Sequence, residues 1–226
     1  MDFDDTPQEA AFRAEARAWI REHAPRELHD ELAAAGFGQP ALRSRDLMTA
    51  AKAWQKRKQA GGWACLHWPR EYGGRGASPI ERVIWDQEEG VYAKLSRIFI
   101  IGHGMCGPTV MAFAEEPHRR RYLPPLASGE EVWCQMFSEP VAGSDLAGLR
   151  TRAERDGDHW VVNGQKIWTS GAHLSDYGIL LVRTDFEVPK HDGLTMFFVD
   201  MKSPGIEVRP IKQVNGESHF NEVFFT

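Results

Sequence analysis

The chain has 226 residues and a formal net charge of −5, and 42% of its residues are hydrophobic against 26% charged. This length accommodates one large domain or two small ones, and the composition is typical of a folded globular protein. The acidic balance argues against a nucleic-acid partner, because proteins that bind nucleic acids concentrate basic charge. No apolar run reaches the roughly 20 residues of a membrane span, and the acidic residues 1–7 are unlike a signal or transit peptide.

Helical spacing of the apolar residues marks the first half of the chain. Thr6 supplies a capping hydroxyl and Pro7 the first helical position of a helix that ends at Pro25. Further helices are predicted over residues 44–60, from Ser78–Pro79 onward, and over residues 109–115 and 117–127. In the helix that starts at Ser78, we expect the apolar side chains to face the core, namely Ile80, Val83, Ile84 and Val91.

Residues 102–107 fit the glycine spacing of dinucleotide-binding folds. That spacing counts only within a strand–turn–helix unit that is followed by a second strand and an acidic residue. The flanks here are helical, so a nicotinamide site is disfavoured, and a segment whose glycines leave room for a ligand or a neighbouring helix is the better interpretation. His103 and Cys106 lie in this segment, but two ligands do not make a metal site.

Cysteines are few, widely spaced and odd in number. Cys65, Cys106 and Cys134 therefore indicate buried thiols rather than a disulfide framework or a metal site. Buried free thiols suit a reducing compartment, and we expect a cytoplasmic protein.

From Val132 onward the apolar period shifts to two, and short runs alternate with turn residues. Strands are predicted over residues 151–155, 159–162, 165–168, 177–183, 194–201, 205–210 and 222–225. Asp156–Gly157 and Asn163–Gly164 are strong hairpin signals between such runs. The predicted fold is α+β, with an all-α helical domain over residues 1–131 followed by an antiparallel β-barrel domain over residues 132–226. The last strand runs up to Thr226, so we expect the barrel to be truncated there.

Two stretches carry the candidate site. Residues 135–145 lead from apolar residues into a loop of small, hydroxyl-bearing and acidic residues, which can bring backbone N–H groups close to a ligand. Residues 164–171 place the aromatic ring of Trp168 beside further hydroxyls. A loop of donors next to a flat ring suits a flat cofactor that forms hydrogen bonds.

The sequence of residues 138–145, Ser-Glu-Pro-Val-Ala-Gly-Ser-Asp, resembles the acyl-CoA dehydrogenase signature, and residues 164–170 resemble the second flavin segment of that family. Residues 69–74, 122–126 and 220–225 are similar to other segments of the family, in the same order. The resemblance implies an N-terminal helical domain, a middle β-barrel and a C-terminal four-helix domain that this chain lacks.

The resemblance also implies FAD as the cofactor and a role for each matching residue. Phe137 and Ser138 should contact the pyrimidine edge of the flavin, Trp168 should pack against the isoalloxazine ring, and Ser170 should form a hydrogen bond near the nitrogen that accepts hydride. Ser144 should contact the CoA portion of the substrate. The complete expected cofactor-binding set is Gln135, Phe137, Ser138, Gly143, Ser144, Trp168, Thr169 and Ser170. Residues 135–137 are bulkier than is usual in the family, and Val141 stands where a glycine is common.

The implied activity is FAD-dependent α,β-dehydrogenation of an acyl-CoA thioester in lipid metabolism, such as fatty acid β-oxidation. Electrons would pass to an electron-transferring flavoprotein, and the full-length protein would be a homo-oligomer. Two alternatives stay open: an oxidase or monooxygenase of the same superfamily, and a non-catalytic subunit that shares an FAD site in a hetero-oligomer. The catalytic glutamate is expected beyond Thr226, so we expect the 226 residues alone to be inactive. Glu139 is expected to fix the loop rather than to act as the base.

Overall fold

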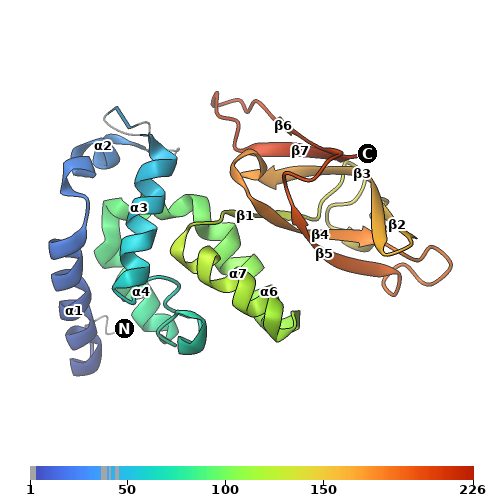
Figure 1. Ribbon diagram of the computed structural model, residues 1–226. Helices are drawn as coiled ribbons and strands as arrows, with labels where there is room; N and C mark the ends of the chain where they lie inside the picture. Colours follow the sequence, from blue (N-terminus) through green and yellow to red (C-terminus); the bar gives the residue numbers. More distant parts are fainter. Residues whose placement is uncertain (1–3, 37–39, 41, 44–45) are drawn as a thin grey trace. The chain divides into compact units, whose positions relative to one another are not determined.

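The computed structural model describes residues 4–36, 40, 42–43 and 46–226. Contacts divide the chain into two compact units, one made of residues 1–103 and 110–130 and the other of residues 104–109 and 131–226. Figure 1 shows helices in the blue-to-green part of the chain and strands in the yellow-to-red part. The helical half and the β half of the predicted α+β fold are therefore both present.

Short 3₁₀ turns lie between some of the helices. The helices are α1 (Pro7–His23), α2 (His29–Ala34), α3 (Leu47–Ala60), α4 (Pro79–Glu89), α5 (Ala93–Ser96), α6 (Gly107–Phe113) and α7 (Glu116–Ser128). Thr6 and Ser78 begin α1 and α4, and a proline occupies the first turn of each helix, as predicted. Each of these residues is also part of a capping box. Asp46 caps α3, and the predicted start of that helix at residues 44 and 45 lies outside the described residues.

An aromatic cluster forms a core where α1 packs on α4. Ala16 and Ile20 of α1 contact Trp63, Leu66 and Trp85, and the rings of Trp63 and Trp85 stack with their centroids 4.7 Å apart. The predicted inward face of α4 is only partly correct. Ile84 is buried, but Ile80 and Val83 are 47% and 48% exposed. Because Trp85 and the buried Glu89 lie one turn apart and both face inward, the helix turns Ile80 and Val83 outward.

Residues 102–106 form a π-helical turn with helical residues on both sides. A dinucleotide-binding turn would need a preceding strand at this position, so the glycine spacing has no such context in the structure. His103 donates its Nε2–H to the Leu126 carbonyl at 2.8 Å and stacks on Phe99. Its role is that of a packed histidine. Burial lowers the pKa of the His103 imidazole to about 4, against the opposing effect of the hydrogen bond to Leu126.

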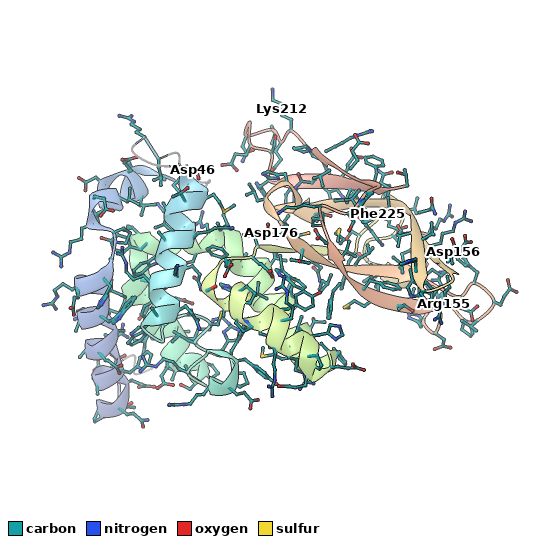
Figure 2. All side chains as sticks on the ribbon, in the orientation of Figure 1. Asp46, Arg155, Asp156, Asp176, Lys212 and Phe225 are labelled. Carbon is teal, nitrogen blue, oxygen red and sulfur yellow. The ribbon has the colours of Figure 1, made fainter. Side chains whose placement is uncertain are left out.

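The β unit contains seven strands in one mixed sheet. They are β1 (Trp133–Met136), β2 (Arg152–Asp156), β3 (His159–Ser170), β4 (Tyr177–Arg183), β5 (Leu194–Asp200), β6 (Ile206–Pro210) and β7 (Phe220–Phe225). The strand order is β1-β4-β2-β3-β7-β6, and β5 also pairs with β4. A core of buried side chains lies against this sheet, including Cys134, Met136, Leu180, Val223 and Phe225. Phe225 is labelled in Figure 2.

The predicted antiparallel barrel is wrong in detail, because the sheet is mixed and open. β1 pairs with β4 in parallel, with Trp133 opposite Tyr177, and β2 also meets β4 in parallel, through Arg152 and Arg183. A long connection separates β1 from β4, so β4 can return in the same direction as β1. Turn signals in a sequence report hairpins between neighbouring strands and carry no information about such distant parallel pairs.

Only one of the two predicted hairpins forms. β2 and β3 pair across a two-residue turn at Gly157 and Asp158, one position later than predicted, next to the labelled Asp156 in Figure 2. Asn163–Gly164 is not a turn, because β3 runs through it without interruption. A Cβ atom at Gly164 would lie 2.5 Å from Thr151 Oγ1, so this glycine permits a close backbone approach within the strand.

The three cysteines are free and buried, as predicted. Burial raises the pKa of the Cys65 and Cys134 thiols to about 12, so neither is a reactive thiolate at neutral pH. Within the described residues, no helix is long and apolar enough to cross a membrane.

Candidate functional site

The two stretches singled out in the sequence lie side by side in the β unit. The first follows β1, and the second is the end of β3. The backbone N–H of Ile167 donates to the Ser138 carbonyl at 2.9 Å. Lys166 Nζ donates to the Phe137 carbonyl at 3.0 Å. Residues that are about 30 positions apart in the sequence are therefore joined directly at Phe137 and Ser138.

A buried ion pair lies next to the contacts of Phe137 and Ser138 with β3. Lys166 Nζ is 2.8 Å from Glu139 Oε1, and the two side chains are 0% and 4% exposed. The Glu139 carboxylate also accepts the backbone N–H groups of Arg150 at 2.6 Å and Thr151 at 2.9 Å. These donors all belong to the loop or to β3, which is the loop-fixing arrangement expected for Glu139.

Electrostatics keep Glu139 ionised. Burial raises the pKa of its carboxyl, but the hydrogen bonds from Lys166, Thr151 and Arg150 outweigh that cost and hold the pKa below its usual value. Burial lowers the pKa of Lys166, and its hydrogen bond to Glu139 opposes that shift. Breaking such a pair would leave one uncompensated charge inside the sheet, which typically costs about 3–5 kcal/mol.

Trp168 stands on a β-bulge. The pairing of β3 with β7 shifts register between Lys166 and Thr169, and Trp168 adopts φ +61°, which is rare for any residue other than glycine. Its side chain is exposed, at 56% for the residue, and its ring meets Phe220 edge to face, with the centroids 6.1 Å apart. A strained backbone that presents a large aromatic ring to solvent is a feature found at functional sites, and it costs about 1–3 kcal/mol.

The bulge changes the direction of the residues that follow. Thr169 is 1% exposed, and its hydroxyl has no hydrogen-bond partner among the described residues. The buried Asn221 donates to the Thr169 carbonyl at 2.8 Å and contacts His173 Nδ1 at 3.0 Å. Ser170 is partly exposed and pairs with Phe220 at the end of β3. Trp168 and Ser170 thus lie on either side of a buried threonine.

The remaining candidates lie at the edges of the site. Gly143 and Ser144 are exposed at the tip of the loop, and Gln135 lies in β1 opposite Ile179. Next to Ser144, the Asp145 carboxylate pairs with Lys190, with both oxygens 2.8 Å from Nζ. This pair ties the loop to the segment between β4 and β5.

Sequence reasoning missed Lys166 and Thr151. Neither belongs to the predicted cofactor set, yet one forms the ion pair and the other holds its carboxylate. A lysine in the middle of an apolar strand pattern was the available signal, because a lysine is almost never fully buried unless it is paired.

The site residues fit a flavin. The exposed indole of Trp168 offers a face for a flat ring, and the partly exposed Ser138 and Ser170 each carry a hydroxyl that can form hydrogen bonds. Among the described residues, no group of three or more His, Cys, Asp or Glu could hold a metal ion.

Comparisons with known proteins cover nearly the whole chain. Residues 6–130 match the family acyl-CoA dehydrogenase, N-terminal domain, and residues 134–226 match acyl-CoA dehydrogenase, middle domain. Acyl-CoA dehydrogenase IpdE1 of Mycobacterium tuberculosis (strain ATCC 25618 / H37Rv) is 43% identical over 215 residues, which cover 95% of this chain and 54% of that protein.

Two solved structures are also similar. The Tcur3481-Tcur3483 steroid ACAD has a TM-score of 0.78 and 32% identity, over 100% of this chain and 56% of that one. The ChsE4-ChsE5 complex from Mycobacterium tuberculosis has a TM-score of 0.78 and 30% identity, and the match covers 100% of this chain and 55% of that one. The chain spans about half the length of these relatives. Because both domain families match in order along the chain, it belongs to the acyl-CoA dehydrogenase family.

Proposed function

We propose that this chain is the flavin-binding part of an enzyme that removes hydrogen from the α- and β-carbons of an acyl-CoA thioester. Membership of the family supports the reaction class. The observation that carries the proposal is the direct junction between residues 137–138 and β3, where Ile167 N meets the Ser138 carbonyl. That junction gathers the donors and the aromatic ring that a flavin requires.

The chain's own residues would bind and orient the cofactor. FAD, when bound, supplies the acceptor for the hydride from the β-carbon. Trp168 would pack against the ring and exclude water from one of its sides, and Phe137 and Ser138 would present donors to the pyrimidine edge. Ser170 would donate a hydrogen bond near the hydride-accepting position. Donors held in place before the reaction stabilise the negative charge that reduction brings to the ring.

The contacts of Glu139 argue against it as the base that takes the α-proton. Its carboxylate is 4% exposed and already accepts hydrogen bonds from Lys166, Arg150 and Thr151. A general base must reach the proton that it removes, and this carboxylate faces the protein interior. The proposal therefore assigns the base to a carboxylate of the assembled enzyme other than Glu139.

Substrate and partners follow from the relatives. The similarity to a steroid ACAD favours a bulky, ring-bearing acyl group, with Ser144 contacting the CoA portion. An electron-transferring flavoprotein is the proposed acceptor of the electrons, and the enzyme is proposed to be a cytoplasmic oligomer.

A second candidate is a subunit that shares one FAD with a different chain. Both similar structures carry two component names, and one of them is called a complex. In that case FAD would saturate a mixture of the two chains at one equivalent per pair.

Titration of the chain with FAD, followed by quenching of flavin fluorescence, tests the proposal. We expect saturable binding that the substitution Trp168→Ala weakens by about tenfold, since loss of an aromatic contact costs about 1 kcal/mol or more. Trp160→Ala is the matched control, because Trp160 is 43% exposed on the same strand but far from the bulge. Equal weakening by both substitutions, or no binding at all, would refute the flavin site.

Activity is tested anaerobically with acyl-CoA thioesters of straight-chain and ring-bearing acids. The assembled enzyme should bleach the flavin with the ring-bearing substrates, whereas the 226-residue chain alone should not. Oxygen consumption during turnover would favour the oxidase alternative over the dehydrogenase.

A further inference from the structure

We infer that Lys166 and Glu139 are positioning residues for the flavin. Their buried ion pair fixes the position of residues 135–145 relative to residues 164–171 before FAD binds. The inference rests on the proposed function and deepens it. Both side chains are buried, at 0% and 4% exposure, so neither is presented to a ligand at the surface. Each acts through the neighbours that are proposed to contact the cofactor.

The position of the pair along the chain supports this role. Glu139 directly follows Ser138, and Lys166 precedes Trp168 by two residues, across the bulge. Lys166 Nζ bonds to both Glu139 Oε1 and the Phe137 carbonyl, so it holds the loop on each side of Ser138. A shift of the Lys166 ammonium group would therefore move Ser138 relative to Trp168.

The carboxylate also closes the loop that leads to Ser144. It accepts the N–H groups of Arg150 and Thr151 at the far end of the loop. At the near end, the Glu139 backbone exchanges two hydrogen bonds with Ala142, at 2.9 Å and 3.1 Å. One residue thus holds both ends of a segment whose middle, residues 143–145, is exposed.

An apolar pair could not replace this arrangement. Buried ion pairs are often exchanged for hydrophobic residues without loss of stability. Here such an exchange would remove the side-chain partners of the Phe137 carbonyl and of the N–H groups of Arg150 and Thr151. These backbone groups are part of the loop itself, so losing their partners disturbs its shape rather than only its stability.

The helical unit offers a matched control. Lys58 and Glu89 also form a buried pair, with Nζ 2.9 Å from Oε1 and the side chains 6% and 4% exposed. Glu89 further accepts the indole N–H groups of Trp54 and Trp85, at 2.7 Å and 3.1 Å. These partners belong to the helical core, so this pair stabilises the helices and none of these contacts involves a predicted flavin residue.

The test compares two double variants, Lys166→Met with Glu139→Gln and Lys58→Met with Glu89→Gln. For each we would measure the thermal midpoint, the Kd for FAD and the shape of the visible flavin band. We expect both variants to lose thermal stability. Only the Lys166/Glu139 variant should weaken FAD binding, on the order of tenfold, and lose the band shape of the bound flavin, because small misplacements of a binding group have large effects.

The outcomes separate this inference from the proposed function. If the wild-type chain does not bind FAD, the proposed function fails and the inference falls with it. If Trp168→Ala weakens binding while the Lys166/Glu139 variant binds like wild type, or like the Lys58/Glu89 variant, the inference alone is overturned.

A measurement on the wild-type chain covers the case in which the Lys166/Glu139 variant does not fold. Hydrogen exchange of the amides of Thr151 and Ile167 should already be slow without FAD, because the ion pair orders both segments in advance. Fast exchange that slows only after FAD is added would show that the cofactor, and not the ion pair, sets their positions.

Discussion

Gly164 is the residue at which a single methyl group should most directly disturb the site. A Cβ atom there would lie 2.5 Å from Thr151 Oγ1 and 2.7 Å from Thr151 Cα, and the residue has φ +154°. One of these neighbours is backbone, so it cannot rotate away as the end of a flexible side chain could. Overpacking of this kind costs about 1–3 kcal/mol, and a backbone conformation reserved for glycine adds about 1–3 kcal/mol.

We therefore expect Gly164→Ala to lower the free energy of unfolding by about 3 kcal/mol, within the combined range. At about 4–8 °C per kcal/mol, this corresponds to a fall of roughly 15 °C in the thermal midpoint of the β unit. Displacement of Thr151 would also lengthen its 2.9 Å hydrogen bond to Glu139, so FAD binding should weaken at temperatures where the variant is still folded.

Urea unfolding followed by far-UV circular dichroism measures the effect, with Gly157→Ala as the control. Gly157 lies in the hairpin turn before β3, with φ +59°, and a Cβ added there would meet no atom within 4 Å beyond its chain neighbours. The Gly157→Ala variant should lose only about 1–2 kcal/mol of unfolding free energy, because alanine is disfavoured in the left-handed backbone conformation. Equal losses for the two variants would refute the argument that contact with Thr151 dominates.

Three further predictions concern the rest of the chain. Thr6→Ala removes the side-chain acceptor of the capping box of α1 and should cost about 1 kcal/mol, measured by urea unfolding against Thr109→Ala, a substitution at a half-buried threonine inside α6, as a control. Leu180→Ala empties a fully buried site of the sheet core and should cost about 2–5 kcal/mol by the same assay, and a loss below about 1 kcal/mol would contradict the packing of that core. The pKa of His103 is about 4 when folded and 6.5 when unfolded, so the unfolded chain binds the proton more tightly. The stability that the neutral His103 contributes is fully present above the unfolded pKa, and it falls by about 2 kcal/mol when the pH is lowered to roughly 5. Urea unfolding above pH 6.5 and near pH 5 measures this loss, which His103→Phe should abolish.

Local signals in the sequence were sufficient for the elements that depend on neighbouring residues. The helix starts at Thr6 and Ser78 and the hairpin between β2 and β3 all formed, because a cap or a tight turn is decided by residues within a few positions of each other. The shift of the apolar period from helical to alternating marked the change from helices to strands for the same reason.

Motifs in the sequence were also sufficient to identify the family, since residues 138–145 and 164–170 are contiguous runs. The roles of their residues toward FAD remain predictions. The structure adds that the two runs are joined at the Ser138 carbonyl.

Tertiary structure alone decided the features that depend on distant residues. The parallel pairing of β1 with β4, the unbroken course of β3 through Gly164, and the outward face of Ile80 each depend on what the rest of the chain packs against them. The Lys166–Glu139 pair is the clearest case. In the sequence these are a lysine and a glutamate 27 positions apart, each of a type that is normally exposed. Only the fold buries both side chains at the same place. Burying either charge alone would be costly, so the two are stable there only as a pair.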